Sequence, residues 1–143
     1  MDKPLIRTVA AVIRDAGGRV LLVRKRGTPT FIQPGGKREP GEDAITTLAR
    51  ELAEEIGVGL RGEALRLGEF EDVAVNEPGR RVRAEVFLVE VEGQPSPQAE
   101  IEEMAWVDPA APGERIIAPL SRGQILPAVA ALPRTEGSER IGA

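Results

Sequence analysis

Three glutamates, Glu51, Glu54 and Glu55, have the type and spacing that metal-assisted chemistry needs. Each residue of an α-helix advances by about 100°, so these carboxylates would project within an arc of roughly 100°. Carboxylates crowded in this way repel one another, and a divalent cation relieves the repulsion while leaving coordination positions for phosphate oxygens. The competing interpretation is an ordinary solvated helix face. Arg50 precedes Glu54 by one helical turn and can orient a carboxylate without occupying the metal site.

The composition narrows the chemistry, because the chain contains neither cysteine nor histidine. Disulfides, thiolate nucleophiles, Ser-His-Asp triads and metal sites built from Cys or His are therefore excluded. Any bound metal must take oxygen ligands, which favours hard cations such as Mg²⁺, Mn²⁺ or Ca²⁺. The net charge of −4 and the lack of a long basic run argue against double-stranded nucleic acid as a partner.

The segment from Gly36 to Val58 carries a longer pattern that weighs against the solvated-surface interpretation. It resembles the Nudix box, G-x5-E-x7-R-E-U-x-E-E-x-G-U with U a bulky aliphatic residue, and all nine specified positions match. The matching residues are Gly36, Glu42, Arg50, Glu51, Leu52, Glu54, Glu55, Gly57 and Val58. The sequence is therefore similar to those of Nudix hydrolases. The resemblance implies an α/β protein with the Nudix fold, an α/β/α sandwich around a mixed β-sheet.

The resemblance also implies catalytic roles for the matching residues. Glu54 and Glu55 are expected to bind Mg²⁺ or Mn²⁺, with the carbonyl of Gly36 as a frequent further ligand. Glu51 is expected to be either a ligand or the general base, held in place by Arg50. The implied reaction is attack of a metal-activated water on one phosphorus of a diphosphate linkage.

Three further residues in or beside the motif, Gly35, Glu42 and Gly57, are expected to be structural. Glu42 would bond within the box and brace its loop against the helix. Gly35 and Gly36 would allow a tight backbone path past the metal. Gly57 follows the last apolar residue of the expected helix, where a left-handed cap is favoured.

Many family members add a carboxylate from a loop before the last strand, and the acidic segment 100–103 matches that place. Of Glu100, Glu102 and Glu103, we favour Glu100, because it stands six residues before Trp106 as in similar members. The alternative interpretation is an exposed acidic loop. Glu85, on a neighbouring strand, is a weaker candidate for the same role.

Substrate contacts are less sharply indicated. Phe31 is the best candidate for stacking on a base, because it precedes the glycine pair. Lys37 and Arg38 follow that pair and could touch phosphate, as could Arg24 in the basic run 24–26. A second arginine group could reach a substrate or a partner subunit, and consists of Arg80, Arg81 and Arg83.

The substrate class expected from the resemblance is a nucleoside diphosphate derivative. The short chain and the run Pro34-Gly35-Gly36-Lys37 look most like small MutT-type members, which act on (deoxy)nucleoside triphosphates, including oxidised ones. ADP-ribose or a sugar nucleotide is the alternative. A non-enzymatic Nudix-fold nucleotide sensor is a further alternative, although such modules usually have an eroded box.

Strands and helices are expected in an order that suits this fold. The clearest helix covers 43–56, where Ile45, Leu48, Ala49, Leu52 and Ile56 recur at helical spacing. Strands are expected at 6–13, 19–24, 65–75, 82–92 and 105–107, with a short extended piece at 31–33. The first two of these strands are expected to form a hairpin. A late helix is expected over 120–132, with Pro127 either kinking it or beginning its second half.

The chain is expected to form one Nudix domain over residues 1–133, followed by a flexible tail at 134–143. No apolar stretch approaches the ~20 residues of a membrane span, and no signal peptide is visible, so a cytoplasmic location is expected. Dimerisation is common in the family, and the hairpin around Arg80 could support a homodimer.

Overall fold

The computed structural model describes residues 4–75 and 77–133. The elements in chain order are β1 (Ile6–Ile13), β2 (Val20–Lys25), β3 (Phe31–Ile32), β4 (Gly35–Gly36), α1 (Ala44–Ile56), β5 (Gly59–Val73), β6 (Arg81–Glu92), β7 (Ile101–Val107), η1 (Leu120–Ile125) and α2 (Leu126–Ala130). Every element expected from the sequence is present, although several bounds differ.

The strands form two sheets. A four-stranded mixed sheet has the order β4-β1-β6-β5, with β1 and β6 parallel and the other pairs antiparallel. A three-stranded antiparallel sheet has the order β3-β2-β7. The prediction that the first two strands form a hairpin is therefore wrong. The two strands touch through a single bridge, Arg14 to Val20, and each then joins a different sheet.

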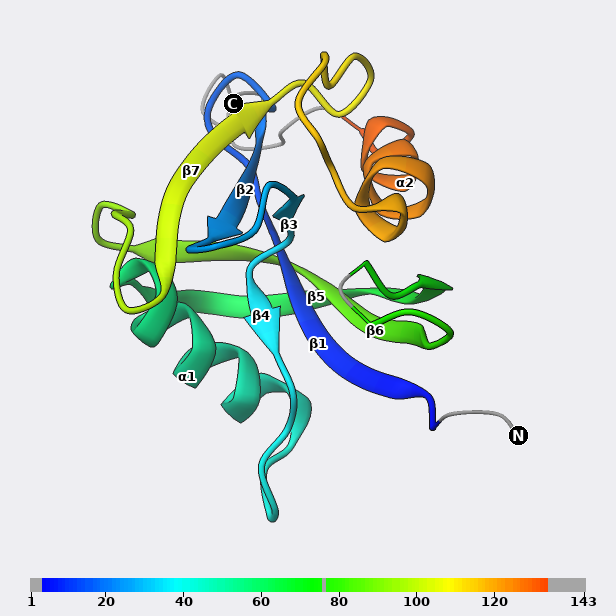
Figure 1. Cartoon of the computed structure of the whole chain (residues 1–143). Helices are drawn as coiled ribbons and strands as arrows, with labels where there is room; N and C mark the ends of the chain where they lie inside the picture. Colours follow the sequence, from blue (N-terminus) through cyan, green and yellow to red (C-terminus); the bar gives the residue numbers. More distant parts are fainter. Residues whose placement is uncertain (1–3, 76, 134–143) are drawn as a thin grey trace.

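The core lies on both faces of β1, whose residues from Val9 to Ile13 are all buried. On one face Val9, Ala11 and Ile13 pack with Leu48, Leu52 and Ile56 of α1. On the other face Ala10 and Val12 pack with Ile125, Leu126 and Val129 of the final helical segment. Helices thus cover opposite sides of the strands, as Figure 1 shows. This arrangement confirms the predicted α/β/α sandwich with a mixed sheet.

Helix α1 buries a slightly different face from the one expected. Leu48, Leu52 and Ile56 are fully buried, but Ile45 is 39% exposed. Thr47 and Glu55 are buried in addition. The buried face is therefore rotated toward the acidic positions, because β4 and the loop before β7 pack on that side of the helix.

Other bounds differ for local reasons. β5 begins at Gly59 rather than at residue 65, directly after α1, and irregular register at 61–65 interrupts its ladder with β6. β7 begins at Ile101, so Glu102 and Glu103 lie in a strand and not in a loop.

The late helix has two parts. Of the two alternatives expected for Pro127, the structure shows the second: the proline lies at the start of the second part. Residues 120–125 form a π-helical turn, in which the N–H of Leu126 donates to the carbonyl of Ser121. Proline has no N–H to continue an α-helical ladder, and it occupies the first turn of α2, where no such donor is required.

Across the described ranges, no helix is both long and apolar enough to cross a bilayer. The tail expected at 134–143 lies outside the described residues.

Candidate active site

Helix α1, which carries the box glutamates, is capped at both ends. The Asp43 side chain accepts a hydrogen bond of 2.8 Å from the N–H of Thr46, which satisfies a free donor of the first turn. Gly57 adopts φ 71° and donates its N–H to the carbonyl of Ala53. A Cβ on Gly57 would also lie 2.1 Å from the side-chain nitrogen of Gln98. Gly57 is thus favoured by its left-handed backbone, and a larger residue there would displace the end of the Gln98 side chain.

The three box glutamates differ strongly in exposure. Glu55 is 4% exposed, and its carboxylate accepts one hydrogen bond, from the N–H of Gly35 at 3.1 Å. The pKa of Glu55 rises to about 8, mainly because the carboxyl is buried; the Gly35 hydrogen bond opposes the rise, and the nearby Glu51 contributes to it. Burial also raises the pKa of Glu51, although Arg50 opposes the rise. The side chain of Glu54 is 57% exposed. The helix therefore presents one buried, one half-buried and one exposed carboxylate.

Strand β4 runs close to the Glu51 carboxylate and to the backbone of β1, and both of its residues are glycine. A Cβ on Gly36 would lie 2.4 Å from a carboxylate oxygen of Glu51. Gly35 has φ 146°, and a Cβ there would lie 2.1 Å from the carbonyl oxygen of Val9. The first clash is with the catalytic candidate itself and the second is with the backbone of β1. The glycine pair therefore brings main-chain polar groups beside Glu51 and Glu55.

Arg50 connects the box loop to the helix. Its guanidinium bonds Glu42 at 2.7 and 2.9 Å, Glu51 at 3.0 Å and the carbonyl of Lys37 at 3.1 Å. Glu42 also accepts bonds from the hydroxyl of Thr47 and the N–H of Glu39. The Arg50 bonds are the main reason that the pKa of Glu42 falls to about 2. Glu42 and Arg50 thus form an ion-paired brace that holds the Glu51 carboxylate from one side.

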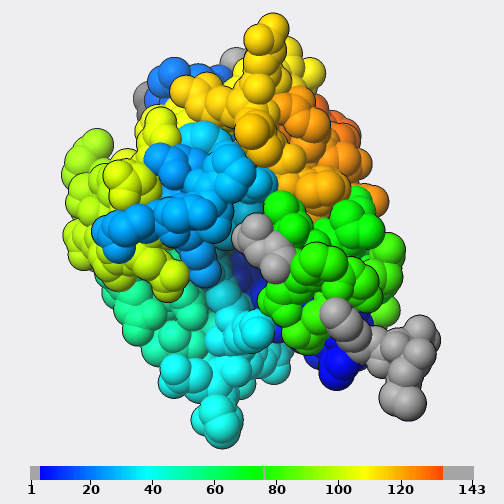
Figure 2. All heavy atoms as spheres, viewed as in Figure 1, coloured from blue at the N-terminus to red at the C-terminus, as the bar shows by residue number. Residues whose placement is uncertain are grey.

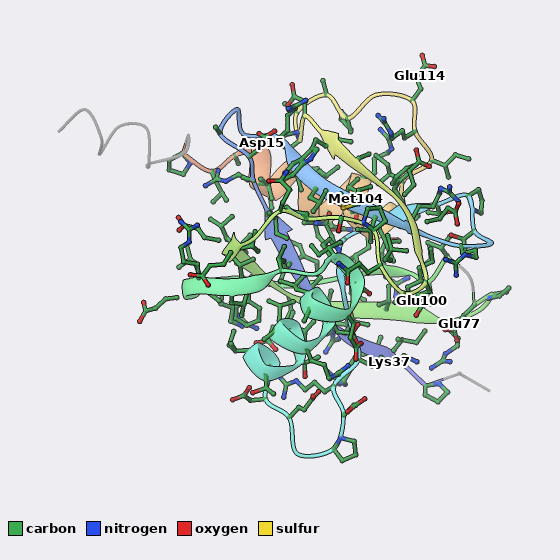
Figure 3. The ribbon with its side chains drawn as sticks, turned by 90° about the vertical axis from the view of Figure 1, so that its left-hand side faces the viewer. Asp15, Lys37, Glu77, Glu100, Met104 and Glu114 are labelled. Atoms are coloured by element: carbon green, nitrogen blue, oxygen red, sulfur yellow. The ribbon has the colours of Figure 1, made fainter. Side chains whose placement is uncertain are left out.

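The loop before β7 brings Glu100 to the C-terminal end of α1. Backbone N–H groups of Ser96 and Gln98 donate to the carbonyls of Ile56 and Glu55, at 3.1 and 2.9 Å. Glu100 is close enough to Glu55 to raise the pKa of that carboxyl slightly. In Figure 3, Glu100 and Lys37 lie toward the same side of the molecule.

Lys25 lies near the acidic residues of the site, although the adjacent Arg24 was the predicted substrate contact. Its ammonium lies 4.0 Å from Glu100 and lowers the pKa of both Glu51 and Glu55. The adjacent Arg24 is paired instead with Glu103, and the register of β2 with β7 shifts between Arg24 and Lys25. Local sequence does not separate the two residues, because the strand register is irregular between them.

Two of the predicted substrate contacts, Arg24 and Phe31, are engaged by partners within the protein. The Arg24 side chain bonds Glu103 at 3.0 Å and the carbonyl of Thr28 at 2.9 Å. Phe31 is 5% exposed within the second core cluster, and the Arg115 guanidinium lies 5.8 Å from its ring centroid. The Phe31 ring is therefore not open to a base in this structure.

Glu85, the weaker alternative for an additional metal ligand, is tied into ion pairs. It bonds Arg66 at 2.9 Å and Arg38 at 3.0 Å. These bonds lower the pKa of Glu85, and the bond from Arg66 has the largest effect. A carboxylate that already neutralises two guanidinium groups is a poorer cation ligand than Glu55, whose side chain accepts one hydrogen bond from the residues that the structure describes.

The donor set fits a hard divalent cation. Within residues 4–75 and 77–133, no three acidic side chains are gathered into a ready-made metal cluster. Even so, Glu55 is buried with a single hydrogen bond, and Glu51 stands against Gly36. A buried carboxylate without a cation is costly at neutral pH, and a divalent ion with oxygen ligands offsets that cost. Glu51, Glu54 and Glu55 are the residues that would hold it, with Glu100 and the Gly36 carbonyl nearby.

Comparisons with known proteins agree with this geometry. The sequence profile of the NUDIX domain family matches residues 4–129. The 8-oxo-dGTP diphosphatase of Haemophilus influenzae is 40% identical over 76 residues, which are 50% of this chain and 56% of that protein. The chain thus matches little more than half the length of this relative.

Two solved structures extend the likeness to nearly the whole chain. The Escherichia coli ORF135 protein superposes with a TM-score of 0.72 at 26% identity, covering 90% of each chain. The MutT protein from Methanosarcina mazei Go1 superposes with a TM-score of 0.70 at 25% identity, covering 99% of this chain and 98% of that one.

Proposed function

Because this chain belongs to the NUDIX domain family, we propose that it is a divalent-metal-dependent pyrophosphohydrolase of (deoxy)nucleoside triphosphates. In this reaction water attacks one phosphorus, a P–O–P linkage breaks, and a nucleoside monophosphate and pyrophosphate are released. The observation that carries the proposal is the buried Glu55 carboxylate, which lies beside Glu51 and accepts a hydrogen bond from the N–H of Gly35.

Each residue of the site has a task in this proposal. Glu54 and Glu55 would hold the cation, and Glu51 would either share it or accept a proton from the attacking water. Arg50 fixes the Glu51 carboxylate through a bond of 3.0 Å. A bound Mg²⁺ or Mn²⁺ would neutralise charge on the diphosphate and lower the pKa of water. Lys25 supplies a positive charge beside the same carboxylates.

The likeness to the Haemophilus influenzae 8-oxo-dGTP diphosphatase favours a triphosphate, including an oxidised one, as the substrate. ADP-ribose and sugar nucleotides are the alternative class within the same chemistry.

The test is a substrate screen of the purified protein with Mg²⁺ and with Mn²⁺. The panel contains nucleoside triphosphates, 8-oxo-dGTP, ADP-ribose, sugar nucleotides and dinucleoside polyphosphates, and both released phosphate and released pyrophosphate are followed. Glu54→Gln is the control, because this exposed side chain can change without disturbing the core. We expect pyrophosphate release from a triphosphate that disappears in Glu54→Gln. Tight binding of one ligand without turnover would replace the hydrolase proposal with a nucleotide sensor.

A further inference from the structure

A polar groove opens on the four-stranded sheet, on the part of its face that α1 leaves uncovered. Its volume is about 450 Å³. The lining residues are Arg7, Thr8, Val9, Lys37, Arg38, Glu69, Arg83 and Glu85. Figure 2 shows the hollow between the cyan segment that follows β4 and the green β5–β6 hairpin, with dark-blue β1 at its bottom. The lining contains no aromatic side chain.

The groove has an excess of positive charge. Both carboxylates that line it are neutralised by ion pairs: Glu85 with Arg38 and Arg66, and Glu69 with Arg66 at 3.5 Å. Arg83, in turn, is paired with Glu71 at 2.8 Å. The lining and these partners together contain five basic side chains and three carboxylates, in a chain whose net charge is −4. A local excess of cations in an acidic protein indicates an anionic ligand.

Two of the five cations are available to a ligand. Arg7 and Lys37 are exposed and make no ion pair or side-chain hydrogen bond within the described residues. They come from different elements, β1 and the segment after β4, and both line the groove. An anion placed there would find two unpaired donors from two different elements.

The groove continues directly from the candidate active site. Val9, which lines the groove, pairs with Gly36 across β1 and β4. Gly36 stands against the Glu51 carboxylate, and Lys37 is the next residue. A diphosphate held at Gly36 and Glu51 can therefore extend into the groove without leaving the surface.

We propose that this groove binds the end of the substrate that leaves as pyrophosphate, with Arg7 and Lys37 as its unpaired phosphate contacts. The inference rests on the proposed function and deepens it, since it ties the preference for triphosphates to residues outside the Nudix box. A base would require a flat apolar partner, which the groove lacks, whereas phosphate oxygens suit Arg and Lys.

The test compares a nucleoside triphosphate with the corresponding diphosphate, whose leaving group is a single phosphate and reaches less far. Arg7→Gln and Lys37→Gln are each expected to raise KM for the triphosphate about tenfold, the scale of one lost charge-assisted contact. The diphosphate should change by less than about twofold. Arg61→Gln is the matched control, because Arg61 is an exposed arginine of the same sheet outside the groove. Equal losses on both substrates, or none, would overturn the inference.

Binding of pyrophosphate alone, measured by calorimetry in EDTA, separates this inference from the proposed function. Without metal, the glutamates repel pyrophosphate, so the groove cations must account for any binding. Wild-type binding that Arg7→Gln weakens about tenfold would support the groove even if no triphosphate were hydrolysed. If wild type does not bind pyrophosphate, or if Arg7→Gln binds it as tightly as wild type, the groove is not a pyrophosphate site, whether or not the protein is a hydrolase.

Discussion

Replacement of Glu55 by Gln should stabilise the metal-free protein while it abolishes metal binding. Glu55 is 4% exposed, and burial raises its pKa from 4.5 to about 8. The unfolded carboxyl releases its proton near pH 4.5, whereas the folded one keeps it until about pH 8. Between these values the unfolded state binds fewer protons, so the stability of the wild type falls as pH rises.

The expected size follows from the shift. One pKa unit corresponds to about 1.4 kcal/mol, so the complete shift amounts to about 5 kcal/mol. At pH 7, where the folded carboxyl is still largely protonated, the loss is about 3 kcal/mol. Glutamine avoids this loss and can still accept the N–H of Gly35, but its buried NH₂ group costs roughly 1–2 kcal/mol. The net gain expected for Glu55→Gln in EDTA is therefore about 1–2 kcal/mol at pH 7.

Urea denaturation in EDTA, followed by fluorescence of the single tryptophan, Trp106, measures this difference. The wild type should lose stability from pH 5.5 to 7.5, while Glu55→Gln should show a flatter profile. Glu54→Gln serves as the control, since its exposed side chain should change the free energy of unfolding by less than about 0.5 kcal/mol. Added Mg²⁺ at 100 times Kd should stabilise the wild type by about 3 kcal/mol and the Glu55→Gln protein far less. A flat wild-type profile in EDTA, or a Glu55→Gln protein that is less stable than wild type, would refute the reasoning.

Two further perturbations test the braces around the site. Because Arg50 lowers the pKa of Glu42 to about 2, this pair should stabilise the fold above about pH 4.5, and its contribution should fade as pH falls from 4.5 toward 2. Glu42→Gln should therefore have a lower free energy of unfolding than wild type at pH 7, and this difference should disappear in acid-unfolding curves as the pH falls. A difference that does not change with pH would contradict the role of the ion pair. Gly57→Ala should cost about 1–2 kcal/mol of unfolding free energy for its left-handed backbone and should displace Gln98, whereas Gly59→Ala, with open space around its added Cβ, should cost little in the same urea titration.

Much of the site was determined by local spacing. The helix 44–56, its N-cap Asp43 and its left-handed Gly57 follow from residues within a few turns of one another. The bonds from Arg50 to Glu42 and Glu51 also join positions within a single loop and helix. Such contacts can be inferred from a sequence because helical geometry sets the distance between residues three or four apart.

Only the tertiary structure decided how the three glutamates differ. The burial of Glu55 depends on β4 and on the loop before β7, which lie 20 and about 40 residues away along the chain. Long-range packing also left Ile45 exposed on α1, and separate contacts in the second core cluster buried Phe31.

The choice between Arg24 and Lys25 likewise required the partner strand. Residue type suggests phosphate binding for both, but the register of β2 with β7 sets Arg24 against Glu103. The sheet division that separates β1 from β2 and opens the groove beside Gly36 arises from pairings with β6 and β7, far along the chain. Sequence alone thus determined which residues are present and how they are spaced along the chain, because local geometry fixes these. Folding decided which of them are buried, paired or free, because pairing and desolvation depend on elements remote in sequence.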